Sequence, residues 1–472
     1  MPVSTPPSEP HLQKGGPADR LVAPFQRLLR RRFAREVLTL QVGSFATMGI
    51  QFVASVVIPN ELGAANYGSY LAARNLLDLV TTFANLAVGQ ALITKLAASY
   101  SRRDEEESLS LLAYFLKVGL IVGLVESAIG LLAGNYVGAL FMGDPEAGDL
   151  ARVLFVIPPL TVILNMVVLA LQSSRQIARL ALLENGALML TSVFNAGVVA
   201  MGGGLNGLLY SAAFAPLLTS IGALWLYRST LSKMPGFPTL GQLVRAAPVV
   251  PFRRYFAFSA LVSVDKNFAN LIGLVPTTLL ARYSSKAELA YFRVGFNLMN
   301  FLSVPLAPIA RNLYATLAET LARRGARQMG MTLLKATLLA GGISVASTAF
   351  MILASPHILM IYRHEYGAAQ PVMYALGLRF ALLGFGVGLG PIYQILNAMK
   401  LAIVTKAVPA AIMVGGGYLM ISQYGAVGAA LTLVAAYVVG DITNAVLVPW
   451  MVRRAAMGGP AVAKPANSGG RQ

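Results

Sequence analysis

Apolar stretches long enough to cross a bilayer alternate with short polar segments along most of the chain. A transmembrane helix needs about 20 mostly apolar residues, so each stretch predicts one membrane-spanning helix. Six are predicted in the first half, at residues 37–58, 67–98, 109–133, 150–172, 177–201 and 205–227. Six more are predicted in the second half, at residues 255–281, 289–317, 331–354, 372–395, 401–422 and 427–452. The pattern therefore predicts an all-α integral membrane protein of about 12 helices.

The second set of six stretches repeats the first at a constant offset of 221 residues. The matched pairs include Tyr70 with Tyr291, Leu96 with Leu317, Arg179 with Lys400, Gly204 with Gly425 and Gly207 with Gly428. Because each unit holds an even number of spans, both units enter the membrane from the same side. We therefore predict two parallel six-helix lobes, and transporters built in this way hold their substrate between the lobes.

The lobes divide the chain into five parts. A Pro- and Ser-rich, then basic, tail is predicted at residues 1–36, and a second tail at 453–472. Between them we expect an N-terminal lobe at 37–227, a basic connector at 228–254 and a C-terminal lobe at 255–452. The tails carry too few apolar residues to form a core, so we expect them to be disordered.

Lysine and arginine gather in every second loop, as at residues 30–32 and 453–454. An excess of these residues marks the cytoplasmic side of a membrane protein, so both termini are predicted to be cytoplasmic. The alternate loops are acidic or nearly neutral, and three basic residues stand out in them: Arg282, Lys286 and Arg363.

Composition excludes several other classes of protein. The chain is 56% hydrophobic and only 12% charged, which is too apolar for a soluble protein of 472 residues. Its net charge of +18 lies in loop clusters between apolar stretches, so we expect no nucleic acid partner. Cysteine is absent and the three histidines are spread over a tail and one loop, so we expect no disulfide, no metal site and no cofactor.

Ionisable residues inside the predicted spans are the candidate functional groups, because a charge in hydrocarbon must face protein or water. We expect Arg74, Lys266, Arg293 and Arg379 to contact a substrate, since a guanidinium fork suits phosphate oxygens. Arg74 lies four residues before Asp78, so a structural ion pair within one helix is the alternative for that residue. Arg293 and Arg379 have no acidic residue at helical spacing, and each must meet either another helix or a ligand.

Two further sets of residues have candidate roles. The carboxylates that could carry a coupling proton or sodium ion are Asp78, Glu126, Asp265 and Asp441, and the sequence selects none of them. Lys117, Arg311 and Lys406 lie nearer the predicted cytoplasmic ends, where a long side chain reaches the interface. The glycines of GFGVGLG at 384–390 precede no P-loop Lys-Ser or Lys-Thr, so we interpret them as a packing site or a hinge.

Three segments carry a resemblance to a known family. They are LGAANYGSYLAARNLLDLVTTFANLAVGQALITKLAASY (62–100), HEYGAAQPVMYALGL (364–378) and YGAVGAALTLVAAYVV (424–439). Through them the chain, from about residue 35 to 454, resembles the Wzx-type flippases for lipid-linked oligosaccharides. These belong to the multidrug/oligosaccharidyl-lipid/polysaccharide exporter superfamily.

The resemblance implies two lobes in a V around a cationic cavity in the bacterial inner membrane. It implies export of a polyprenyl-pyrophosphate-linked glycan from the cytoplasmic to the periplasmic leaflet, with a polysaccharide polymerase and a chain-length regulator as further expected partners. A cation-coupled multidrug exporter of the same superfamily is the alternative. Loops 134–149 and 355–370, the longest on the predicted outer side, are short, so we do not expect an enzyme.

Overall fold

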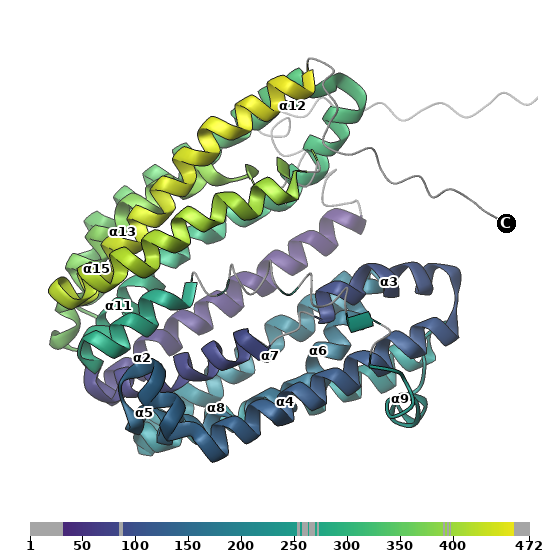
Figure 1. The fold of residues 1–472 in the computed structure, drawn as a ribbon, viewed down its shortest axis with the longest axis horizontal. Helices are drawn as coiled ribbons and strands as arrows, with labels where there is room; N and C mark the ends of the chain where they lie inside the picture. Colours follow the sequence, from purple (N-terminus) through teal and green to yellow (C-terminus); the bar gives the residue numbers. More distant parts are fainter. Residues whose placement is uncertain are drawn as a thin grey trace, which may run out of the picture.

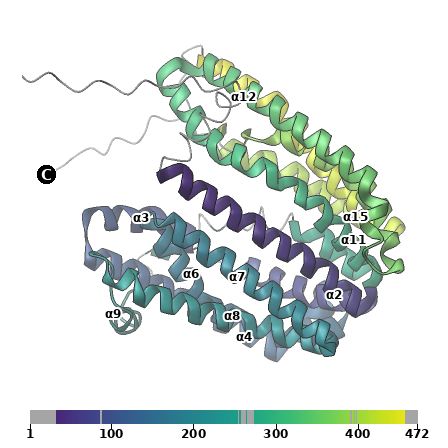
Figure 2. The same cartoon turned by 180° about the vertical axis from the view of Figure 1, so that it is seen from behind.

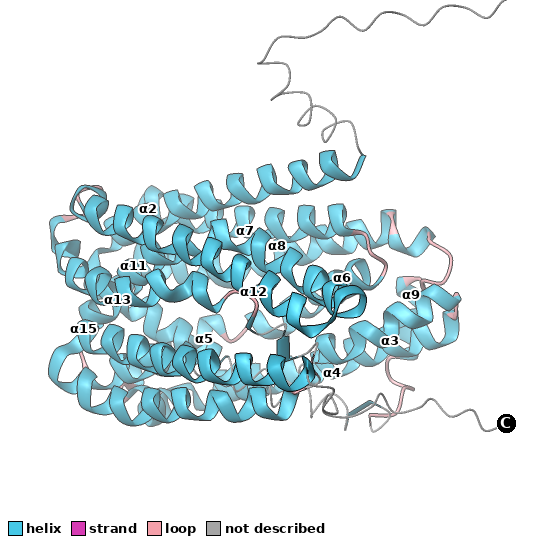
Figure 3. Ribbon diagram, turned by 90° about the horizontal axis from the view of Figure 1, so that it is seen from above, coloured by secondary structure: helices cyan, strands magenta, loops and turns pink. Residues whose placement is uncertain are grey.

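The computed structural model describes residues 32–84, 88–252, 273–389 and 398–456, and a few residues in the intervals between these ranges. Helices make up nearly all of this part of the chain, and no strand occurs in it. Within each lobe the long helices run side by side along the length of the lobe (Figure 1 and Figure 3), as helices that cross a bilayer do. The predicted all-α membrane fold is therefore confirmed.

The N-terminal lobe contains α2 (Arg32–Ala84), α3 (Val88–Arg102), α4 (Glu105–Met142), α5 (Pro145–Leu154), α6 (Ile157–Ser173), α7 (Ile177–Val198), η1 (Val199–Gly203) and α8 (Gly204–Ser229). The connector contains η2 (Leu231–Lys233) and α9 (Leu240–Ala246). The C-terminal lobe contains α11 (Lys286–Asn300), η3 (Phe301–Leu306), α12 (Ala307–Leu359), η4 (His364–Ala369), α13 (Gln370–Leu383), η5 (Gly384–Gly386) and α15 (Met399–Ala456).

Several of these helices turn back on themselves at a glycine with positive φ. In α15 the turn is at Gly425 (φ 53°, ψ −128°), a backbone conformation open almost only to glycine. After the turn the two arms pack together, since a Cβ atom on Gly440 would lie 3.2 Å from Pro409. Similar turns divide α2 at Gly63 and α12 at Gly325. Such a helix has an uninterrupted pattern of backbone hydrogen bonds, but it reverses at the glycine and crosses the membrane twice.

The internal repeat has a backbone counterpart. Gly204, at the start of α8, has φ 59° and ψ −157°, close to the values of Gly425, which lies 221 residues later. Each glycine begins the last span of its lobe, after a reversal of the chain. The repeat seen in the sequence is therefore also a repeat of local conformation.

Six helices in the described part of the chain meet the length and hydropathy of a membrane span, or seven if α5 and α6, bent by 44°, form one span. Three of the six contain a glycine turn, so these long helices cross the membrane more than once. The total of twelve stays a prediction, because most of residues 255–272 lie outside the described residues.

The two lobes meet at one end and separate towards the other, so that they form a V (Figure 1). The closed end holds α5 and α11, and the open end holds α3 and α9. At the closed end one apolar cluster spans both lobes and includes Leu62 and Tyr67 of α2 and Phe292 and Tyr366 of the C-terminal lobe. Towards the open end each lobe has its own cluster, around Tyr114 or around Leu317.

The first half of α2, before Gly63, runs between the two lobes (Figure 2). Gly43 of this arm lies beside Asn185 of α7, and the Phe52 ring lies 5.6 Å from the ring of Phe301 in η3 of the other lobe. This position makes it a wall of any space enclosed between the lobes.

Candidate functional site

Hydrogen bonds from loop residues seal the closed end of the V. Asn60 Nδ2 donates to the Ile361 carbonyl at 2.9 Å, and Asn60 Oδ1 accepts from the Arg363 amide at 2.8 Å. The Ala64 amide donates to Glu365 Oε1 at 2.9 Å. Each of these bonds joins the N-terminal lobe to the C-terminal lobe, so each must break before this end can open.

A buried tyrosine adds to the same seal. The Tyr366 hydroxyl donates to the Pro59 carbonyl at 3.1 Å. Burial raises the pKa of Tyr366, and the neighbouring Tyr67 and Glu365 raise it further. The hydroxyl therefore remains protonated and keeps this bond at any physiological pH.

A lysine and an arginine of the C-terminal lobe complete the contacts. Lys286 Nζ lies 2.6 Å from Glu146 Oε2 and 3.2 Å from Asp144 Oδ2, and Arg282 donates to the Leu140 carbonyl. The alternate loops, which are otherwise acidic or nearly neutral, contain three basic residues: Arg282, Lys286 and Arg363. The structure explains why basic residues occur in these loops, because all three lie at contacts between the lobes.

Deeper in the closed half, Asn75 of α2 bonds two threonines of the other lobe. Thr277 Oγ1 donates to Asn75 Oδ1 at 2.6 Å, and Asn75 Nδ2 donates to Thr278 Oγ1 at 2.9 Å. Asn75 is only 6% exposed. A satisfied amide at this depth fixes how the lobes are aligned.

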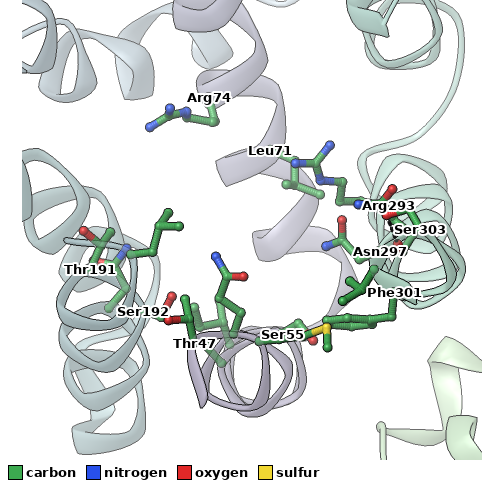
Figure 4. Close-up of a pocket in the computed structure, with 18 of the residues that line it drawn as sticks. Thr47, Ser55, Leu71, Arg74, Thr191, Ser192, Arg293, Asn297, Phe301 and Ser303 are labelled. Carbon is green, nitrogen blue, oxygen red and sulfur yellow. Dashed lines mark hydrogen bonds between the residues drawn. The ribbon is translucent and has the colours of Figure 1, made fainter. Parts of the chain in front are cut away.

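A cavity of about 610 Å³ lies between the lobes, above this sealed end. Its walls are both arms of α2, the middle of α7, and α11 with η3 (Figure 4). Polar side chains and a few aromatic rings line it. A space of this size, between two lobes that can rock, is where a transported molecule would bind.

Two of the predicted substrate contacts, Arg74 and Arg293, line this cavity, one from each lobe. Arg74 Nε lies 3.1 Å from Asp78 Oδ1, so the predicted ion pair within the helix is confirmed. Both side chains of this pair are still about two fifths exposed, at 41% and 40%. Arg293 is exposed to the cavity and forms no ion pair with any carboxylate of the described residues.

The remaining arginine candidate, Arg379, lies elsewhere. It is not among the residues that line the cavity, and its guanidinium carbon is 3.6 Å from the centre of the Tyr437 ring. Asp441, one helical turn after Tyr437, interacts electrostatically with it. The charge of Arg379 is thus met by another helix of its own lobe, which is one of the two situations that the sequence left open.

The other predicted residues are dispersed. Glu126 is 3% exposed, and its Oε2 accepts a hydrogen bond from Thr81 at 3.0 Å within the N-terminal lobe. Lys117 Nζ donates to the carbonyls of Pro248 and Val250 in the connector, both at 3.0 Å. Asp265, Lys266 and the side chain of Arg311 lie outside the described residues. Of the three carboxylates that the structure describes, Asp78, Glu126 and Asp441, Asp78 alone lines the cavity.

The glycine motif of the tenth predicted span breaks its helix. At η5 the backbone leaves the α-helical form, and Gly384 lies so close to α12 that a Cβ atom would be 2.1 Å from the Ala340 carbonyl oxygen. Gly388 follows with φ 92°. The interpretation of these glycines as a close packing site is confirmed.

Sequence reasoning missed the uncharged polar residues of the cavity. They recur at helical spacing in otherwise apolar spans: Ser44, Thr47, Gln51 and Ser55 on α2, and Asn185, Ser192 and Asn195 on α7. A search restricted to charges passes over them. The signal that would have found them is a polar stripe with a period of three to four residues.

A family model described as polysaccharide biosynthesis protein matches residues 33–321. No curated protein matches the sequence. Among solved structures, an inward-facing multidrug resistance MATE family transporter of the MOP superfamily superposes with a TM-score of 0.68 at 18% identity, over 86% of this chain and 96% of that chain. Lipid II flippase MurJ, in an inward closed conformation, gives 0.68 at 13% identity, over 89% and 90%.

A third structure is a MOP superfamily transporter from Pyrococcus furiosus, described as having a binding pocket of reversed polarity. It gives a TM-score of 0.59 at 16% identity, over 91% of this chain and 98% of that chain. At these identities the matches show the fold. The fold is the one that these transporters have, and together with the family match it confirms the resemblance drawn from the sequence.

Proposed function

This chain belongs to the polysaccharide biosynthesis protein family, and from that premise we propose that it is a flippase for a polyprenyl-pyrophosphate-linked oligosaccharide. The observation that carries the proposal is the pair of guanidinium groups, Arg74 and Arg293, which face one cavity from opposite lobes. The pyrophosphate of the substrate would bind between them and link the two lobes.

The charges of the cavity agree with an anionic headgroup. Its described lining carries Arg74 and Arg293 against the single carboxylate of Asp78. A guanidinium binds phosphate oxygens through two parallel hydrogen bonds, and both bonds are strengthened by the opposite charges of the two groups. A positive cavity disfavours the alternative, a multidrug exporter that takes cationic drugs.

The two ends of the V give the direction of movement. Its open end carries the basic clusters of 102–103 and 323–324, which mark the cytoplasmic side. In this state the cavity would take up substrate from the cytoplasm, and breaking the contacts of the closed end would release it to the periplasm. The oligosaccharide would then be available to a polymerase on that side, and a chain-length regulator would act with it.

Gene deletion with lipid analysis tests the proposal. We expect the deletion strain to accumulate polyprenyl-pyrophosphate-linked oligosaccharide in the cytoplasmic leaflet and to lose surface polysaccharide. Wild-type protein should restore export. Arg293→Gln should not, at an equal level of protein in the membrane, because the cavity would lose its unpaired cation.

Arg323→Gln is the matched control, because that arginine is exposed at the open end and pairs with Glu319 at 3.2 Å. It should restore export fully. Unchanged lipids and surface polysaccharide in the deletion strain would contradict the proposal. Full export by Arg293→Gln would contradict the assignment of the cavity.

A further inference from the structure

One wall of the cavity is polar but uncharged. Thr191 and Ser192 on α7 face Arg293 and Asn297 across the space, with Thr47 and Ser55 of α2 between them (Figure 4). All charged groups of the described lining lie on the second arm of α2 and on α11. The first arm of α2 and α7 contribute only hydroxyls, amides and apolar groups.

The polar groups of this wall have unused hydrogen-bonding capacity. The hydroxyl of Thr47 donates to the Gly43 carbonyl of its own helix, which leaves its oxygen free to accept. Within the described part of the chain, the side-chain amides of Gln51 and Asn185 form no hydrogen bond. Each amide offers two donors and one acceptor to a bound molecule.

Asn195 is the strongest single indication of a ligand. It is 8% exposed, it lines the cavity, and its Oδ1 is buried with no hydrogen-bond partner. Buried polar atoms in folded proteins almost always have a partner, so an unpaired one facing a cavity indicates a donor from a bound molecule. The donor must be a neutral group such as a hydroxyl, or a cation.

Aromatic rings complete the lining and help to decide between these donors. Tyr67 and Tyr70 are stacked, with their centroids 6.4 Å apart, and Phe301 lies on the opposite lobe. Flat rings beside hydroxyl and amide groups suit a sugar, which has apolar C–H faces and a rim of hydroxyls. A cation would be repelled by Arg74 and Arg293 nearby.

The net charge of the cavity lining limits which sugars it can bind. In the described lining two cations face one carboxylate, so the net charge is +1. A pyrophosphate diester carries two negative charges and would exceed this on its own. An acidic sugar on the wall formed by the first arm of α2 and α7 would add a charge with no cation near it.

We propose that this wall, with Gln51, Asn185, Thr191, Ser192 and Asn195, is a glycan subsite for uncharged sugar residues. The proposal rests on the proposed function, because it assumes that the pyrophosphate lies at Arg74 and Arg293. The arginines bind the anionic linker, and the wall accepts and donates hydrogen bonds to the hydroxyls of the first sugars. The subsite thus selects neutral over acidic glycans.

Binding of three soluble probes to purified protein in lipid nanodiscs tests the subsite. The probes are farnesyl pyrophosphate, farnesyl pyrophosphate esterified to glucose, and the same compound with glucuronic acid, which differs from glucose by one carboxylate. We expect the glucose probe to bind about tenfold more tightly than the glucuronic acid probe. Asn195→Leu should weaken glucose-probe binding about fivefold and leave farnesyl pyrophosphate binding unchanged.

Thr348→Val is the matched control. Thr348 also has a buried oxygen without a partner, but it lies in α12 and does not line the cavity. Removing an unpaired buried polar group should preserve or raise the thermal stability of both variants, and only Asn195→Leu should change binding. Gln51→Leu, on the α2 side of the wall, provides a second variant with the same expected result.

Equal binding of the two sugar probes, or unchanged glucose-probe binding in both Asn195→Leu and Gln51→Leu, would overturn the subsite. The proposed function would still stand if Arg293→Gln weakened all three probes. If farnesyl pyrophosphate did not bind, or bound equally to Arg293→Gln, both the function and the subsite would be wrong.

Discussion

The two lobes contain similar intramembrane charges and place them differently. In the N-terminal lobe Arg74 and Asp78 form a 3.1 Å pair on one helix that faces the cavity. In the C-terminal lobe Arg379 stacks on Tyr437 and interacts with Asp441 on another helix, away from the cavity lining. The residue types are the same, but the first pair is available to a ligand and the second stabilises its own lobe.

Replacing Arg379 should have the largest effect on stability. Arg379→Leu removes the cation that compensates Asp441, and an uncompensated carboxylate inside a membrane protein costs about 2.5–3.5 kcal/mol. We expect a clear drop in the melting temperature of the protein in detergent. The double variant Arg379→Leu with Asp441→Leu should recover most of it, and failure to recover would show that the two charges are independent.

Replacing Arg74 should weaken ligand binding and leave the thermal stability nearly unchanged. Arg74→Gln removes a charge-assisted contact to the pyrophosphate worth about 2 kcal/mol, or about thirtyfold in the dissociation constant of farnesyl pyrophosphate. Thermal stability should change little, because the Asp78 that remains is 40% exposed and can be hydrated. If Arg74→Gln destabilised the protein as much as Arg379→Leu does, the contrast between the lobes would be lost.

The equivalent glycines of the two lobes should differ by a smaller amount. Alanine at either position strains the backbone by about 1–3 kcal/mol. At Gly425 a Cβ atom would also lie 2.7 Å from the Glu288 carboxylate, whereas nothing lies within 4 Å at Gly204. We therefore expect Gly425→Ala to lower the melting temperature more than Gly204→Ala does. The free energy of unfolding of the two variants should differ by about 1 kcal/mol. Equal effects would mean that Glu288 moves aside without cost.

The smallest effect is expected at the contact between the lobes. Lys286→Ala removes partly exposed ion pairs to Asp144 and Glu146, worth about 1 kcal/mol or less. The closed end should open more often, and spin labels across it should show a larger fraction of long distances. Lys335→Ala, at a lysine away from this contact, serves as the control.

The pH dependence of that contact follows from Lys286. Burial lowers the pKa of Lys286, but hydrogen bonds to Glu146 and Asp144, and their charges, outweigh burial and raise it. A raised lysine pKa stabilises the contact fully below its ordinary value of about 10.4, and this stabilisation is lost as the pH rises through the higher folded value. Lys286 therefore stays charged from pH 7 to pH 9, and the spin-label distances of the wild type should be constant over this range.

Much of the fold followed from the sequence, because hydrophobic length and the repeat are encoded locally. The turn at Gly425, its partner Gly204 and the Arg74–Asp78 pair all follow from spacing along the chain. The position of Arg379 does not, because the depth of a residue in the membrane leaves open which way its side chain points. That direction depends on helix rotation, which is set by packing between distant segments such as α13 and α15.

The uncharged wall of the cavity was missed for a different reason. Gln51 and Asn195 carry no charge, so the rule that intramembrane ionisable groups mark function does not select them. The sequence shows the spacing of these residues on each helix. It does not show that α2 and α7 face each other. Only the packed structure brings the two stripes together.

The contacts at the closed end have a consequence for biosynthesis. With the orientation that the basic loops predict, Arg282, Lys286 and Arg363 must be translocated across the membrane against the usual preference of cations. The ribosome has by then already produced the acceptors for all three: Asp144 and Glu146 for Lys286, the Leu140 carbonyl for Arg282, and Asn60 for the Arg363 amide. The lobe synthesised first can therefore act as the template on which the second is inserted.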